Sequence, residues 1–254
     1  VVIYSSVSGN TKEMVELVDH VHKLGARVIA FIDTPGSALT QPGKSEHLIV
    51  YPVNEQLKFF MLANYLMYKN GEFPEYDRYN QEMEAHLAKA LAEVEISADA
   101  WAYHYAKEQV AFKQAHPDLP HYFIGSGTQY GATYSYAMCY WEEQMWVRTK
   151  SISCPEFFHG MQEIIEADTP VTLFMGEDEQ RPLAERVARF LPKVCANYTI
   201  IDTKEFALKG ISPEYRGTIS HLVMHGVNNR VDAYMELFLR HPLTIRRYYR
   251  QFEY

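Results

Sequence analysis

The stretch "YSSVSGNTKEM" (residues 4–14) joins an apolar run to an amphipathic one through a turn of small polar residues. Residues 1–4 are typical of a buried strand, and apolar residues recur at helical spacing over 14–21. Residues 6–11 are therefore expected to form a strand-to-helix turn, where unpaired helical amides and hydroxyl side chains can bind a phosphate. The competing interpretation is that Ser8 or Thr11 only caps the helix.

Repetition of this unit along the chain predicts an α/β fold. Further strands are expected at 25–34 and 47–53, and helices at 55–114, 132–148, 161–168 and 179–191. Because each helix returns the chain to the same sheet edge, such alternation favours doubly wound parallel sheets. We predict two three-layer α/β/α halves, with residues 1–54 as the remainder of the first half, 55–115 as connecting helices, and 116–254 as the second half with a C-terminal tail.

Composition limits the classes of partner. The chain has 254 residues, 47% of them hydrophobic, and this is enough for a sizeable core. A net charge of -8 argues against nucleic acid or an anionic membrane as the main partner. Cys139, Cys154 and Cys195 form no CxxC pair, so neither a disulfide framework nor a zinc site is expected. No apolar stretch is long enough to cross a bilayer, and the predicted location is the cytoplasm.

A second glycine- and serine-rich turn lies at 125–132, in "GSGTQYGA". Glycines after a strand let a ligand approach the backbone, so Ser126 and Gly127 are candidate contacts for a small ligand. A dinucleotide is disfavoured, because the third glycine and the following acidic residue of that fingerprint are missing. The counterpart of the opening turn later in this half is "GEDEQ" (176–180), whose three carboxylates would repel a phosphate.

Two groups are candidates for acid–base chemistry. The helix expected at 132–148 carries Glu142 and Glu143, and Glu143 would share an apolar face with Tyr136 and Tyr140, where a carboxylate could serve as a general base. The alternative is that one of the two carboxylates is solvated and the other salt-bridged. His159 follows a strand in "SCPEFFHG" (153–160), a place where α/β sheets carry catalytic groups, although a lone histidine is more often structural.

Taken together, these motifs resemble the sugar isomerase (SIS) family. They are S-x-S-G-x-T at 6–11, G-S-G-x-x-Y-G-A at 125–132, a glutamate sixteen residues before the histidine of "EFFHG", and the end "HPLTIRRYYRQFEY" (241–254). More narrowly, the chain looks like the fructosamine 6-phosphate deglycases, and the resemblance covers residues 1–254. It implies that the phosphate is bound by Ser6, Ser8, Gly9 and Thr11, and that protons are transferred by Glu143, not Glu142. His159 is the family's histidine, which can open the sugar ring or protonate a departing oxygen.

The sequence departs from the family pattern at two places. Pro155 stands where many relatives have glycine before Glu156. The chain also begins at Val1, inside a strand-like run, whereas the family's first strand, glycine- and serine-rich loop and helix would precede that point. We therefore expect the first half to be truncated at its N-terminus, with part of the sugar-phosphate pocket missing.

The resemblance implies a reaction without metal or cofactor. A base removes a proton from C1 of a phosphorylated Amadori compound, C2 is reprotonated, and water hydrolyses the resulting imine to an aldose phosphate and an amine. Alternatives are an aldose/ketose isomerase of aminosugar phosphates, or a sugar-phosphate-binding protein without turnover. The expected partners are the sugar-phosphate substrate and further copies of the chain, as a homodimer or larger. The amine portion stays open, as does the role of Arg246, Arg247 and Tyr248.

Overall fold

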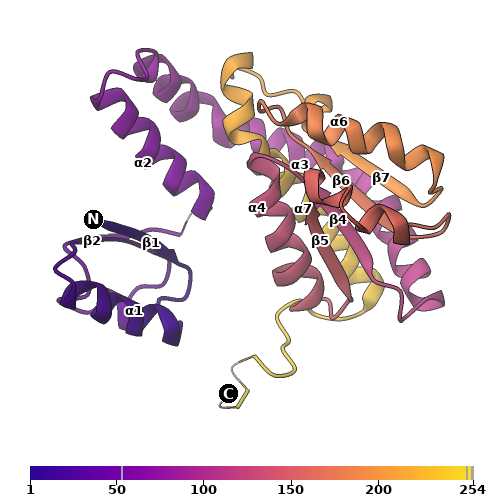
Figure 1. Cartoon of the computed structure of the whole chain (residues 1–254), viewed down its shortest axis with the longest axis horizontal. Coiled ribbons are helices and arrows are strands. Elements are labelled where there is room, and N and C mark those ends of the chain that lie inside the picture. Colours follow the sequence, from indigo (N-terminus) through magenta and orange to yellow (C-terminus); the bar gives the residue numbers. More distant parts are fainter. Residues whose placement is uncertain (53, 250, 253–254) are drawn as a thin grey trace. The chain divides into compact units, whose positions relative to one another are not determined.

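The computed structural model describes residues 1–52, 54–249 and 251–252. It divides into two compact units, Val1–Tyr76 and Asp77–Tyr254 (Figure 1). Each unit is built from parallel strands and helices, which confirms the predicted α/β fold class. Among the described residues, no helix combines the length and the apolar character that crossing a bilayer requires.

The first unit contains a three-stranded parallel sheet of order β1-β2-β3. Its elements are β1 (Val2–Ser6), α1 (Lys12–Lys23), β2 (Val28–Ile32), the 3-10 turn η1 (Ala38–Thr40), β3 (His47–Val50) and α2 (Glu55–Lys69). The apolar stripe of α1 packs on this sheet, where Val18 and Val21 meet Tyr4, Ala30 and Ile32 in one core. The strand predicted at 47–53 ends at Val50, and Val53 lies outside the described residues.

The second unit contains a four-stranded parallel sheet of order β5-β4-β6-β7. The strands are β4 (His121–Gly125), β5 (Thr149–Ser153), β6 (Val171–Met175) and β7 (Tyr198–Asp202). In the centre, Ile124 of β4 lies opposite Ile152 on one side and Leu173 on the other. The two central strands β4 and β6 are buried along their whole length, as continuous apolar strands of a doubly wound sheet should be.

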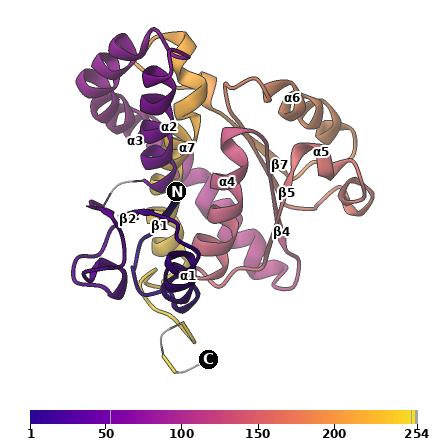
Figure 2. The same cartoon turned by 60° about the vertical axis from the view of Figure 1, so that its left-hand side comes forward.

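Helices cover both faces of this second sheet (Figure 2). On one side lie α3 (Tyr76–Ala115), α4 (Thr128–Ser135) and α7 (Pro213–Leu239), and on the other α5 (Cys154–Phe157) and α6 (Arg181–Phe190). Short turns of helix complete the unit at η3 (Met161–Ile164), η4 (Leu191–Lys193) and η5 (Thr203–Glu205). Long helices are tied to the sheet by buried hydrogen bonds, such as that between the hydroxyls of Tyr105 and Thr172, 2.7 Å apart.

The segment expected to connect the halves is helical, and its two helices group with different units. The first, α2, holds to its own sheet through the ion pair of Lys58 with Asp33 and a hydrogen bond that Ser5 donates to Glu55 at 2.5 Å. The second, α3, packs instead against α7, for example where Tyr79 meets Tyr215 at a centroid distance of 5.2 Å. Contacts within the chain thus place a division near residue 76.

Two predicted helices have other bounds than expected. The helix predicted at 132–148 begins earlier, at Thr128, and turns into a π-helix, η2 (Tyr136–Glu142), before ending. The helix predicted at 161–168 is only the single 3-10 turn η3. A short stretch of apolar spacing therefore indicated helix in both places without fixing its type or length.

Candidate active site

The opening turn is closed by its own side chains. The Ser6 hydroxyl accepts a hydrogen bond from the Gly9 amide at 3.1 Å, and the Ser8 hydroxyl accepts one from the Asn10 amide at 3.2 Å. Gly9 has a φ of 61°, and a Cβ there would lie 2.0 Å from the Ser37 Oγ, so only glycine fits. The chain therefore holds Ser6 to Thr11 in one defined conformation at the carboxyl end of β1.

Helix α1 begins directly after this turn, with Thr11 as its N-cap residue. The Thr11 side chain makes no capping hydrogen bond, and the first bonds within the helix are donated by Met14 and Val15. The amides of Lys12 and Glu13 precede those bonds, so they point toward the open end of the helix. Exposed hydroxyl and amide donors at a positive helix end suit an anion of phosphate size.

The second turn has the same form, but the protein itself fills it. Gly127 adopts a φ of 59° and donates its amide to the Gln180 side chain at 3.1 Å, and the buried Ser126 hydroxyl donates to the Gln180 carbonyl at 3.4 Å. The Asp178 carboxylate accepts from the amide and the hydroxyl of Thr128, at 2.6 and 2.7 Å. The donors of Ser126 and Gly127, which we expected to meet a ligand, thus have partners within the chain.

Glu143 lies at the end of the π-helix, as its C-cap residue. Its amide donates to the Met138 carbonyl, five residues back, at 3.0 Å. The wider π turn shifts the side chains away from the α-helical spacing on which the predicted shared face with Tyr136 and Tyr140 rested. The Glu143 side chain is 35% exposed and forms an ion pair with Arg246 at 2.8 Å.

Glu142, by contrast, is exposed and accepts a hydrogen bond from the Thr149 hydroxyl at 2.7 Å. The two neighbouring carboxylates therefore stand as the alternative interpretation described them, one solvated and one salt-bridged. Both carboxylates line one pocket, and the salt bridge of Glu143 is made at the wall of this pocket.

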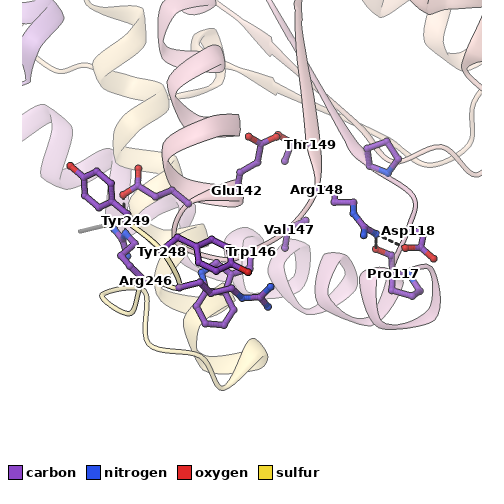
Figure 3. A pocket seen from close by; sticks show the side chains of 13 residues that line it. Pro117, Asp118, Glu142, Trp146, Val147, Arg148, Thr149, Arg246, Tyr248 and Tyr249 are labelled. Carbon is purple, nitrogen blue, oxygen red and sulfur yellow. Dashed lines mark hydrogen bonds and ion pairs between the residues drawn. The ribbon is translucent and has the colours of Figure 1, made fainter. Parts of the chain in front are cut away.

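That pocket has a volume of about 860 Å³ (Figure 3). Three segments distant in sequence line it: residues 117–120, residues 142–149 at the end of the π-helix and the start of the strand that follows, and residues 246–249 of the C-terminal tail. The tail is held there by the Glu143–Arg246 pair, by the Arg247 guanidinium 4.1 Å from the centre of the Trp146 ring, and by His241, whose ring nitrogen lies 2.9 Å from the Gln144 carbonyl oxygen. Trp146 itself has a left-handed backbone, with a φ of 58°.

His159 lies elsewhere in the second unit. It follows α5 at the carboxyl end of β5, is exposed, and donates its amide to the Glu156 carbonyl at 2.9 Å. Glu143 precedes the amino end of the same strand, and five strand residues span about 13 Å at a rise of about 3.3 Å each. Within one chain, the two candidate catalytic groups are therefore at opposite ends of strand β5.

A buried carboxyl supports the π-helix from behind. Asp232 of α7 accepts a hydrogen bond from the Tyr136 hydroxyl at 2.7 Å. Burial raises the pKa of Asp232 to about 7, and burial together with the nearby Asp232 raises that of Tyr136 well above its usual value. The role of Asp232 could not be predicted from the sequence, because an isolated acid within a helix gives no signal of its burial.

Comparison with known proteins adds to this geometry. No model of a known protein family matches the chain. Over its whole length the chain is 30% identical to fructosamine deglycase FrlB of Bacillus subtilis (strain 168), in an alignment of 264 residues that spans 77% of that protein.

Solved structures share the architecture as well. The crystal structure of a candidate phosphosugar isomerase from Bacillus subtilis matches 99% of this chain and 76% of its own, with 28% identity and a TM-score of 0.80. Tagatose-6-phosphate ketose/aldose isomerase from Escherichia coli matches 96% of this chain and 70% of its own with a TM-score of 0.67, and its identity of 14% shows a common fold alone. With a relative of 30% identity aligned along its entire length, the chain belongs to the sugar isomerase (SIS) family, among the relatives of the fructosamine deglycases.

Proposed function

We propose that the protein is a deglycase that splits the fructosamine 6-phosphate of an amino acid into glucose 6-phosphate and the free amino acid. The observation that carries this proposal is Glu143, a carboxylate at the wall of a pocket, in a chain related over its whole length to a fructosamine deglycase. The likeness to a candidate phosphosugar isomerase of 28% identity supports the broader assignment to enzymes that process sugar phosphates.

Glu143 would carry the two proton transfers of this reaction. Its carboxylate takes a proton from C1, the carbon that bears the amine, and the C2 carbonyl oxygen takes up a proton from solvent to become the hydroxyl of an enaminol. Returning the first proton to C2 leaves a protonated imine at C1, whose nitrogen gives a proton back to solvent. Water hydrolyses the imine to the aldehyde and the free amine. The Arg246 guanidinium donates to one Glu143 oxygen at 2.8 Å and so holds the carboxylate at the pocket wall.

Ser6, Ser8, Gly9 and Thr11 would hold the substrate phosphate. The first turn offers hydroxyls and helix-end amides to an anion, and in the second turn a carboxylate of the chain already occupies that place. This contrast supports the first turn, rather than Ser126 and Gly127, as the phosphate site.

His159 would act on the substrate from a second copy of the chain. In one chain Glu143 and His159 lie at opposite ends of strand β5, so a site that contains both needs another subunit. Helix α2 also exposes large apolar side chains, which a partner subunit could cover: Phe59, Met61, Tyr65, Leu66 and Met67. We therefore propose a homodimer or a larger assembly.

The experiment that tests the function follows both products of a fructosamine 6-phosphate. Release of glucose 6-phosphate and amine in equal amounts is the expected result, and Glu143→Gln should lower turnover by at least ~10²-fold, because the amide keeps the shape but accepts no proton. Glu142→Gln is the matched control and should retain most of the activity. Interconversion of sugar phosphates without amine release would assign the protein to the isomerases instead.

A further inference from the structure

The pocket of Figure 3 is lined by charged groups of both signs. Asp118, Glu142 and Glu143 contribute carboxylates, and Arg148, Arg246 and Arg247 contribute guanidiniums. Arg148 is 64% exposed and pairs with the exposed Asp118, so that pair belongs to the rim. Arg246 is only 19% exposed and stands beside the proposed base, Glu143. A shielded arginine at the reacting end of a pocket is placed to recognise an anionic part of the substrate.

Not all donors of Arg246 are used within the chain. Its Nε donates to Glu143 at 2.8 Å, and its Nη1 donates to the carbonyls of Leu243 and Ile245, at 2.6 and 3.0 Å. A guanidinium has five N–H groups, so the two on Nη2 remain, and the described part of the chain supplies no acceptor for them. Arg246 can therefore bind a further carboxylate while its backbone contacts hold it in place.

The proposed reaction fixes which part of the substrate reaches Arg246. Glu143 acts at C1, and the nitrogen on C1 carries the carbon chain of the amine. When that nitrogen is the α-amine of an amino acid, the carboxylate is attached to the very next carbon. This carboxylate then lies three bonds from C1, next to Glu143 and hence next to Arg246. In an amine without a carboxylate, no such group is present.

We propose that Arg246 binds the α-carboxylate of the amino-acid portion of the substrate, and that it exchanges its partner Glu143 for this carboxylate on binding. The exchange frees the Glu143 oxygen that the guanidinium occupies in the unbound chain, so that this oxygen can face C1. The enzyme should in consequence prefer fructosamines formed at the α-amine of an amino acid over those of simple amines. This inference rests on the proposed deglycase function and names its substrate class.

Two matched compounds test the inference, the fructosamine 6-phosphates of alanine and of ethylamine, which differ only in the carboxylate. For the wild-type chain, kcat/KM should favour the alanine compound by about 10- to 100-fold, as expected for charged hydrogen bonds. In Arg246→Gln this preference should fall to near one. Arg246→Lys keeps the charge without the planar fork and should retain part of the preference. Arg148→Gln, at the rim, is the control and should retain all of it.

The possible failures can be told apart. Amine release from both compounds at equal kcat/KM by the wild-type chain would overturn the inference and leave the deglycase function standing, as would an undiminished preference in Arg246→Gln. No amine release from either compound would overturn the proposed function, and the inference with it. Should Arg246→Gln be inactive on both, Arg246→Lys decides, because equal use of the two compounds by that variant also contradicts the inference.

Discussion

At the scale of single residues, two turns of similar sequence differ in one carboxylate. In the second turn, Asp178 accepts hydrogen bonds from Thr128, at the start of α4, and from the Gln180 amide at 2.9 Å. A Cβ on Gly127 would lie 2.3 Å from this carboxylate, so the glycine is needed for the carboxylate to approach. The sequence predicted that the three acids of the turn at 176–180 would repel a phosphate from that turn. In the structure one of them, Asp178, takes the place of an anion at the turn of residues 125–132.

The first turn has no such internal anion among its described contacts, and this leads to a prediction about binding. Ser8→Ala and Thr11→Ala should each weaken binding of a sugar 6-phosphate by ~1 to 3 kcal/mol, because each removes a hydroxyl that can bond a charged phosphate. Calorimetric titration measures this loss. Thr218→Ala, whose hydroxyl bonds the Tyr215 carbonyl in its own helix, serves as the control. Unchanged affinity in the double variant would return the turn to a purely structural role.

At the scale of elements, the π-helix η2 places Glu143, and Asp232 lies beneath it. The folded protein holds the pKa of Asp232 near 7, above its ordinary value near 3.8. Below about pH 4 the carboxyl is neutral in both states, and its burial then carries no penalty for charge. As the pH rises from 4 to 7, the unfolded state loses its proton while the folded state keeps it, so stability falls over this window.

We therefore predict that Asp232→Asn stabilises the protein at pH 8, by about 1 to 4 kcal/mol. The amide of asparagine can still accept the hydrogen bond of the Tyr136 hydroxyl but carries no charge. Urea unfolding at pH 8 and at pH 5 measures the difference, which should shrink at the lower pH. An advantage of the variant that is the same at both pH values would show that Asp232 does not titrate in this window.

The strands were predictable because their signal is local. The apolar run Val28–Ile32 is a strand within the range predicted at 25–34, and α6 lies within the helix predicted at 179–191. The π-helix was not predictable. It differs from an α-helix in bonding to the carbonyl five residues back instead of four, and no residue type in this stretch signals that difference. Nor was the Glu143–Arg246 pair, which joins residues 103 positions apart. The family resemblance was enough to identify Glu143 and His159 as candidates. Their positions at opposite ends of β5 are known only from the structure.

At the scale of the whole molecule, the distribution of the candidate groups over each chain determines what an active assembly requires. In the second unit, Glu143 and the pocket that residues 246–249 help to line lie at the amino end of β5, and His159 lies at the carboxyl end of the same strand. If each reaction uses Glu143 of one copy and His159 of another, every closed dimer contains two such sites related by symmetry. A substitution of either residue in one chain then inactivates only the site to which that residue contributes, and the other site of the dimer is unaffected.

This arrangement predicts complementation between two inactive variants. In a mixed dimer of Glu143→Gln and His159→Asn chains, one site carries both substitutions and the other carries neither. Random mixing makes half of the dimers mixed, so co-expressed or subunit-exchanged samples should recover about a quarter of the wild-type turnover of a fructosamine 6-phosphate. Each variant alone should stay far below that level, and light scattering should show the same assembly in all samples. Were the mixture no more active than its components, Glu143 and His159 of the same chain would have to serve one site, which their positions at either end of β5 oppose.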